Sequence, residues 1–134
     1  MSPKNRLAAL ILLVFLGAGA ALAQVPRSQA GIDRALARLH DARAMGDRHK
    51  SLVQARLKKS GRVVRWYIYV AIDEQTQAPK ATCGDAFFAV APENLRLTSF
   101  IVTKADRVVL DTDKAYTPDF FKLNCESRDY IYID

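Results

Sequence analysis

The chain has 134 residues, of which half are apolar, and its formal net charge is +6. This length provides one domain with a single modest core, and the apolar content is too high for a disordered chain. The chain has only two cysteines and two histidines, and their spacing forms no cysteine–histidine cluster of the kind that binds zinc.

The first 23 residues have the three parts of a secretory signal in the usual order. Two basic residues precede an apolar run from Leu7 to Ala23, and the run ends in Ala21-Leu22-Ala23, the small residues that a signal peptidase accepts. An uncleaved anchor is the alternative, but the run is a little short for a membrane span of about 20 residues. We expect residues 1–23 to be removed and residues 24–134 to form one periplasmic or secreted domain without a transmembrane segment.

A helix is predicted to begin after a short tether at residues 24–27. Ser28 is a suitable N-cap, because its side chain can accept a hydrogen bond from the first helical turn. Gly46 is expected to end this helix. The apolar residues that recur near the helical repeat are Ile32, Leu36, Leu39 and Met45.

Residues 47–60 permit two interpretations. Asp47 is a suitable cap for a second helix that would carry Val53 and Leu57. The alternation of Gln54 and Arg56 with apolar neighbours instead favours a strand, with a turn into the next strand after it. The apolar spacing alone leaves both open, and we favour the hairpin.

The strongest strand prediction covers residues 62–72, which are dense in β-branched and aromatic residues. Tyr67 and Tyr69 lie on the less apolar face of this strand. The face expected to point into the core carries Val64, Trp66, Ile68, Val70 and Ile72.

Four more strands are predicted at residues 82–91, 95–103, 107–111 and 128–133. The second and third of these are expected to form a hairpin around Lys104-Ala105-Asp106. Between the last two strands, the chain is predicted to be irregular, with one helical turn after Thr117-Pro118. The order of elements predicts an α+β fold, in which one N-terminal amphipathic helix packs across a curved antiparallel sheet of about five strands.

Cys83 and Cys125 are predicted to form a disulfide, since an even pair in a small exported domain is oxidised. The bond would close a loop of about 43 residues, worth about 4 kcal/mol in the chain-entropy model. A redox pair would have a closer spacing, and a metal site would need histidines, but His40 and His49 lie in a distant basic segment.

Charge divides the expected mature chain into two parts. Residues 24–65 have eleven basic and three acidic residues, whereas residues 66–134 have seven basic and eleven acidic residues. The basic part can either bind an anionic surface or pair with the acidic part. Export argues against nucleic acid and favours anionic lipid, wall polymer or an acidic protein. The basic stripe consists of Arg34, Arg38, Arg43, Arg48, Lys50, Arg56, Lys58, Lys59, Arg62 and Arg65.

No catalytic set is found in the sequence, and we predict no catalytic residue, metal or cofactor. The two histidines lie among arginines, and the sequence has no nucleophile elbow, zinc-protease motif or phosphate-binding glycine loop. Asp111 and Asp113, with Asp106 or Asp119 near them, are candidates for a Ca²⁺ site or an acid/base pair. Ordinary turn chemistry explains these acids better, because the glycine and distal glutamate of a calcium loop are missing.

Four tyrosines form the most informative surface signal. Tyr67 and Tyr69 share one face of a strand, as do Tyr130 and Tyr132 of the last strand. If the two strands are neighbours, the four rings form one patch, and protein interfaces are rich in tyrosine. Alternatively, the rings line the half-buried second face of the sheet.

These features predict a small exported, non-enzymatic binding protein. It would be of inhibitor or immunity type, or an accessory subunit of an envelope assembly, with another envelope protein as its partner. One alternative is a ligand or enzyme pocket between helix and sheet, with Asp85, Asp111, Asp113 and Tyr116 as polar groups. Another is binding to an anionic envelope surface through the basic helix. The candidate binding residues are Tyr67, Tyr69, Tyr130, Tyr132, Arg34 and Arg38.

Overall fold

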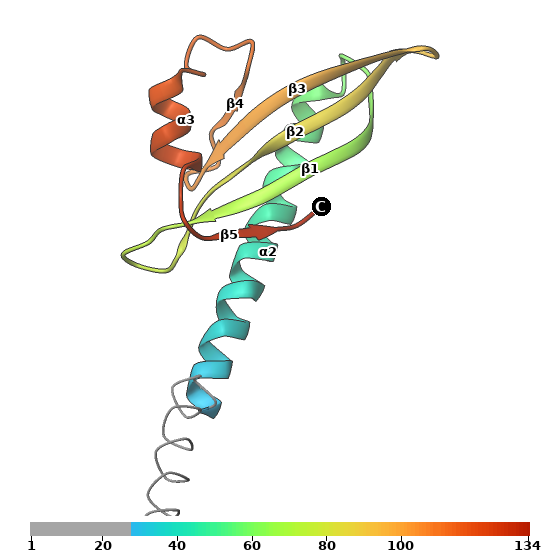
Figure 1. The fold of residues 1–134 in the computed structure, drawn as a ribbon. Helices are drawn as coiled ribbons and strands as arrows, with labels where there is room; N and C mark the ends of the chain where they lie inside the picture. Colours follow the sequence, from blue (N-terminus) through green and yellow to red (C-terminus); the bar gives the residue numbers. More distant parts are fainter. Residues whose placement is uncertain (1–27) are drawn as a thin grey trace, which may run out of the picture. The chain divides into compact units, whose positions relative to one another are not determined.

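The computed structural model describes residues 28–134, so the predicted signal and tether lie outside the described residues (Figure 1). The predicted fold class is confirmed: a helix packs on an open antiparallel sheet, and one disulfide is present. No helix in residues 28–134 is long and apolar enough to cross a membrane. The elements are α2 (Gln29–Leu57), β1 (Arg62–Ile72), β2 (Pro79–Ala91), β3 (Asn94–Thr103), β4 (Val108–Leu110), α3 (Pro118–Cys125) and β5 (Tyr130–Tyr132).

The first helix, α2, is continuous over 29 residues, so the predictions of a helix end at Gly46 and of a strand within residues 47–60 are both wrong. The chain divides into two units between Leu36 and Ala37, inside this helix. In the first unit, Ser28 caps the helix as predicted, because its Oγ accepts a hydrogen bond from the Gly31 backbone N–H at 3.1 Å.

The helix continues beyond Gly46 because its buried positions keep the helical repeat. Val53 and Leu57 pack in the main core with Ile68 and Phe100, which come from the sheet. Gly46 is buried inside the helix, and a Cβ added there would lie 2.9 Å from Ile133 Cγ1. The glycine therefore allows the close approach of the last residues of the chain to α2. The buried residues of α2 are Ala42, Met45, Gly46, His49, Val53 and Leu57.

The five strands form one antiparallel sheet in the order β4-β3-β2-β1-β5. From Ala42 onward, α2 covers one face of this sheet, while α3 packs on the opposite face. The chain from Thr103 to Arg107 forms the predicted hairpin turn, in which Asp106 adopts a positive φ of 66°. Figure 1 shows that β5 is short and lies beside only part of the much longer β1.

A bulge in β1 corrects the predicted core face of that strand. Ile68, Val70 and Ile72 are buried as expected, and Trp66 packs against the core. The pairing of β1 with β2 shifts between Val63 and Arg65, so the alternation of side chains reverses at this point. Val63 therefore packs against the core, whereas Val64 is 52% exposed.

The disulfide between Cys83 and Cys125 attaches α3 to β2, as predicted. This helix has eight residues, more than the single turn expected, and Thr117 caps it by accepting a hydrogen bond from Phe120 N at 3.1 Å. Around the disulfide, Ala81 and Ile101 are buried, and the rings of three aromatic residues pack against them. These aromatic residues are Tyr69, Tyr116 and Phe120.

We predict that Gly46→Leu destabilises the protein by about 1–3 kcal/mol, because the added side chain would displace Ile133. The free energy of unfolding from urea titration measures this effect. Ala44→Leu is the matched control, since Ala44 lies in the same turn of α2 and is exposed. Equal stability of the two variants would contradict the close packing of Ile133 on Gly46.

The double variant Cys83→Ala/Cys125→Ala is expected to lose about 4 kcal/mol of stability, because the unfolded chain is no longer closed across a separation of 42 residues. Urea unfolding of the double variant, compared with that of the disulfide-bonded wild type, measures the loss. A loss below about 1 kcal/mol would show that α3 stays in place without the bond.

Candidate functional site

The pairing of β5 with β1 brings the predicted tyrosines to one face of the sheet. Tyr69 lies directly opposite Tyr132, and Ala71 lies opposite Tyr130. The centroid of the Tyr69 ring is 5.2 Å from that of Tyr130 and 6.1 Å from that of Tyr132. This is the arrangement that the sequence predicted for neighbouring strands. We call Tyr67, Tyr69, Tyr130 and Tyr132 the tyrosine face.

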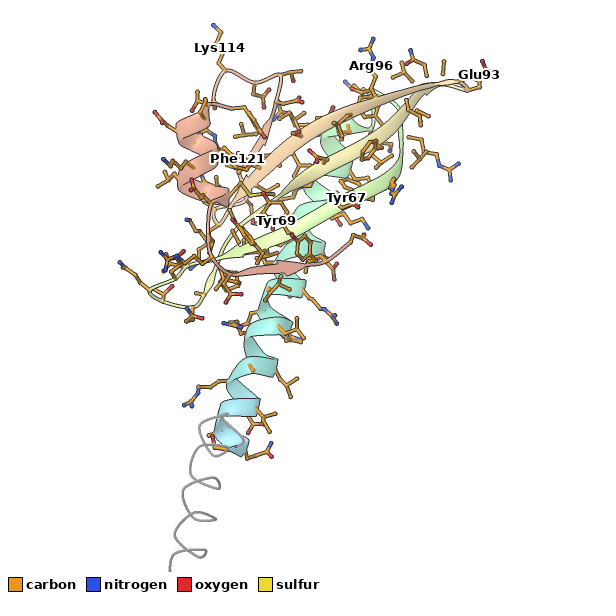
Figure 2. All side chains as sticks on the ribbon, in the orientation of Figure 1. Tyr67, Tyr69, Glu93, Arg96, Lys114 and Phe121 are labelled. Atoms are coloured by element: carbon orange, nitrogen blue, oxygen red, sulfur yellow. A yellow bond between two sulfur atoms is a disulfide. The ribbon has the colours of Figure 1, made fainter. Side chains whose placement is uncertain are left out.

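The four tyrosines differ in exposure. Tyr69 is the half-buried centre, since its ring also packs against the cluster around the disulfide. Around it, Tyr130 is 37% exposed and Tyr132 is 70% exposed. Tyr67 lies two residues before Tyr69 on β1 (Figure 2). The Arg65 guanidinium stacks on its ring, at 5.7 Å from the ring centroid. The tyrosine face is thus an exposed aromatic surface with a fixed centre.

Burial determines the protonation state of this centre. Burial, with a smaller contribution from Tyr130, raises the pKa of Tyr69 to about 12. Its hydroxyl therefore stays protonated and neutral at physiological pH. Phenol groups of this kind offer a partner both a large contact area and a hydrogen-bond donor.

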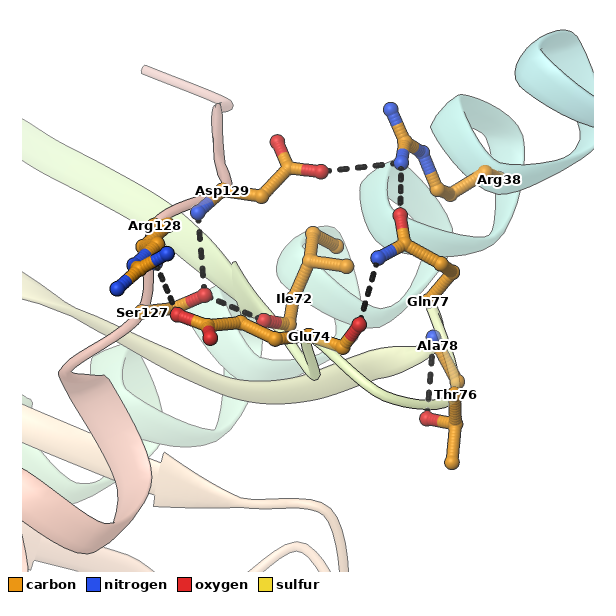
Figure 3. Close-up of polar contacts among 9 residues, drawn as sticks. All are labelled: Arg38, Ile72, Glu74, Thr76, Gln77, Ala78, Ser127, Arg128 and Asp129. Carbon is orange, nitrogen blue, oxygen red and sulfur yellow. Dashed lines mark hydrogen bonds and ion pairs between the residues drawn. The ribbon is translucent and has the colours of Figure 1, made fainter.

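The predicted binding residue Arg38 is occupied by contacts within the protein (Figure 3). Its guanidinium donates to Gln77 Oε1 at 2.6 Å and to Asp129 Oδ2 at 3.0 Å. Asp129 immediately precedes β5, so Arg38 positions the strand that carries Tyr130 and Tyr132. Arg34, the other predicted arginine, lies in the first unit, at an exposed position of α2.

The same network joins the turn after β1 to the turn before β5. The Ser127 hydroxyl donates to the Ile72 carbonyl, and the Asp129 N–H donates to Ser127 Oγ at 3.1 Å. Arg128 N donates to Glu74 Oε1 at 2.9 Å. These bonds fix where β5 begins, and with it the position of the tyrosine face (Figure 3).

Three other basic side chains of α2 form ion pairs with the acidic half. Arg48, Lys50 and Arg56 pair with Asp106, Asp134 and Asp113, respectively. The prediction that the basic helix pairs with an acidic rim therefore describes this part of α2. These three side chains are not free to bind an anionic surface.

His49 forms a buried polar group that sequence analysis did not single out. Its side chain is fully buried, with Nδ1 2.7 Å from Thr82 Oγ1 and Nε2 2.8 Å from Asp106 Oδ1. This order of hydroxyl, imidazole and carboxylate resembles a nucleophilic triad in connectivity alone, because Thr82 is also fully buried and a substrate has no access to it. Burial lowers the pKa of His49, although the hydrogen bond with Asp106 opposes this shift.

The four polar groups predicted for a helix–sheet pocket lie on two sides of the sheet. Asp113 accepts hydrogen bonds from Leu110 N at 2.9 Å and from Arg56 of α2 at 2.8 Å. Asp85 accepts from the Ser99 hydroxyl at 2.6 Å, on the side of Cys83, where Tyr116 packs. Buried core residues fill the middle of the helix–sheet interface. Asp85, Asp111 and Tyr116 thus gather around Ser99, whereas Asp113 lies on the side of α2, so the four groups do not come together between helix and sheet.

The acids considered for calcium serve as turn residues. Asp111 accepts a hydrogen bond from Ser99 N at 3.1 Å, and Asp106 closes its turn by donating from its N–H to the Thr103 carbonyl. Within residues 28–134, no group of three or more acidic, histidine or cysteine side chains is arranged to hold a metal ion.

A cleft of about 790 Å³ opens where α2 ends and β1 begins. It is partly polar, and two cationic side chains, Lys58 and Arg62, belong to its lining. The remaining lining residues are Gln54, Ala55, Gly61 and Val63. Comparison of the chain with protein-family models, curated proteins and solved structures gave no match.

We predict that the stability of the wild type falls as the pH is lowered from 7.5 to 5. Because the pKa of His49 is lowered in the folded state, the unfolded chain binds the proton more readily. The full stability is thus present above the unfolded pKa of about 6.5. It is lost as the pH falls from there to the lower pKa of the folded state, and the total loss is about 1.4 kcal/mol for each pH unit between the two pKa values.

Urea unfolding at several pH values, for the wild type and for His49→Gln, checks this expectation. Glutamine keeps hydrogen-bonding groups at the site but does not titrate. The variant should show a flatter profile between pH 7.5 and 5. A profile as steep as that of the wild type would assign the pH dependence to other groups.

Proposed function

We propose that the chain is an exported, non-enzymatic binding protein of the cell envelope, which recognises another protein through the tyrosine face. The observation that carries this proposal is the cluster of Tyr130 and Tyr132 around Tyr69, with Tyr67 beside it. Rigid aromatic side chains with a polar tip contribute large binding free energies for a small loss of side-chain entropy.

Three further features support a binding role. The face is held in place by the Arg38 network and by the packing of Ile133 on α2, so little ordering is needed on binding. Tyr67 and Tyr132 are more than half exposed, and a contiguous exposed apolar patch marks an interaction site more often than single exposed side chains do. Export follows from the signal predicted in residues 1–23, and the disulfide between Cys83 and Cys125 is typical of an oxidising compartment.

The specific role within this class is that of an inhibitor or immunity-type protein, or of an accessory subunit of an envelope assembly. All of these roles require one rigid recognition surface and no catalytic group. The histidine with a suitable hydrogen-bonding geometry, His49, is buried with Thr82, which is consistent with a structural role.

The proposal is tested by affinity capture from an envelope extract of the source organism at near-physiological salt. The double variant Tyr67→Ala/Tyr132→Ala is expected to lower the affinity for the partner by at least about 2 kcal/mol, or about thirtyfold, if these rings are central to the interface. Partner recovery is quantified by mass spectrometry and then by titration of the purified partner.

Leu123→Ala is the matched control, because Leu123 is 70% exposed, as is Tyr132, and lies on α3. It should leave recovery unchanged. Circular dichroism checks that all variants fold, since the replaced side chains are exposed. The proposal would be contradicted if the tyrosine variant and the control reduced capture equally. It would also be contradicted if no protein were captured specifically from the extract.

A further inference from the structure

Arg56 is the last residue of the basic stripe that forms an ion pair within the described chain. Arg56 pairs with Asp113, but the next four cations along the chain form no ion pair with any residue in the part of the chain that the structure describes. All four are exposed. These four, which we call the edge cations, are Lys58, Lys59, Arg62 and Arg65. They leave a concentrated positive charge where α2 passes into β1.

The same region has an open backbone edge. β5 pairs with β1 only at Tyr69–Ala71, and the last bond of this pairing runs from Ile68 N to the Asp134 carbonyl at 2.8 Å. Within residues 28–134, no other strand lies against the outer edge of β1 from Arg62 to Tyr67. In the described chain, the outer edge of β1 is therefore unpaired past the end of β5 (Figure 1).

Regular alternation identifies the backbone groups at this edge. Ile68 and Ile72 direct their N–H groups toward the β5 side, donating to Asp134 and Asp129. The pairing of β1 with β2 is regular from Arg65 to Ala71, so Trp66 directs its N–H and C=O to the same side. A strand-edge donor and acceptor that no described strand pairs with are a template for another strand.

We propose that this edge of β1 binds an extended, acidic segment of the partner protein. The segment would pair with β1 as a further strand, in line with β5 and past its end. The proposal rests on the proposed function and names the chemistry of the partner. Backbone hydrogen bonds at Trp66 would supply affinity, as in other cases of strand addition. The edge cations would select negative charge, and the cleft beside Lys58 and Arg62 would take side chains of the added strand.

Two other occupants fit this edge less well. A second copy of the chain would bring its own edge cations against the first set, and like charges at close range oppose pairing. A polyphosphate or an anionic lipid would satisfy the charges but would not use the alternating donors and acceptors of the backbone. An acidic polypeptide uses both features, and Tyr67 extends its contact to the tyrosine face.

The test selects phage-displayed random twelve-residue peptides on the full-length chain. Enriched peptides are expected to have a net negative charge. Their enrichment should fall at least tenfold on Arg62→Glu/Arg65→Glu. It should stay unchanged on Arg96→Glu/Lys104→Glu, which reverses two exposed charges of β3 and its following turn. Peptides without an acidic bias, or equal enrichment on both variants, would overturn the proposal.

A second measurement separates strand addition from charge attraction alone. The most enriched peptide, added at saturating concentration, should slow hydrogen exchange of the Trp66 amide at least tenfold. The same peptide with alternate backbone nitrogens methylated should bind at least tenfold more weakly. Unchanged exchange at Trp66, or competition by inorganic polyphosphate as strong as that by the unmethylated peptide, would reject strand addition.

The outcomes separate this proposal from the proposed function. If capture of the envelope partner depends on Tyr67 and Tyr132 but Arg62→Glu/Arg65→Glu does not alter it, the tyrosine face functions without strand addition. If peptides bind at Trp66 while the tyrosine variants capture the partner normally, the edge is the recognition site and the tyrosine face is not.

Discussion

The position of β5 depends on the absence of a side chain at Gly46. Ile133, just after the strand, fits against this glycine, and Ile131 packs in the same cluster with Val70 and Ile72. Because side chains alternate along a strand, burial of these two isoleucines directs Tyr130 and Tyr132 to the opposite face. The tyrosine face is therefore a consequence of apolar packing on the other side of the sheet.

Ion pairs from α2 reinforce this arrangement at both edges of the sheet. Arg38 binds Asp129 before β5, and Lys50 binds Asp134 after it. In the same way, Arg48 and Arg56 bind Asp106 and Asp113, which flank β4. Each pair is partly exposed and contributes at most about 1 kcal/mol. Together they hold both ends of two strands that have only three residues each. The charge asymmetry of the sequence thus serves mainly to attach edge strands to α2.

The sequence predicted the features that depend on local pattern. The long strand, the turn at Asp106 and the disulfide follow from residue type, compartment and spacing. The tyrosine cluster was predicted on the condition that its strands are neighbours, and β1 and β5 are neighbours. Gly46 was misread because its role comes from Ile133, 87 residues further along the chain, and no local signal distinguishes a packing glycine from a terminating one.

Other errors have a similar long-range cause. Residues 47–57 alternate well enough for a strand, and only the shape of the core, with Val53 and Leu57 against Ile68, decides for a helix. Val64 was assigned to the core because a bulge cannot be seen in the pattern of one strand. His49 was placed only in a basic segment, since its partners Thr82 and Asp106 come from strand and turn positions more than 30 residues away.

The tyrosine face and the open edge meet on β1, and their chemistry constrains a partner jointly. On an added strand, alternate side chains point to opposite faces of the sheet. Those on one face would lie near Tyr67 and Arg65, where aromatic or apolar groups gain contact area. Those on the other face would lie toward the cleft at Lys58 and Arg62, where carboxylates are favoured. The partner segment is therefore expected to alternate apolar and acidic residues, and a uniformly acidic segment would use only half of the surface.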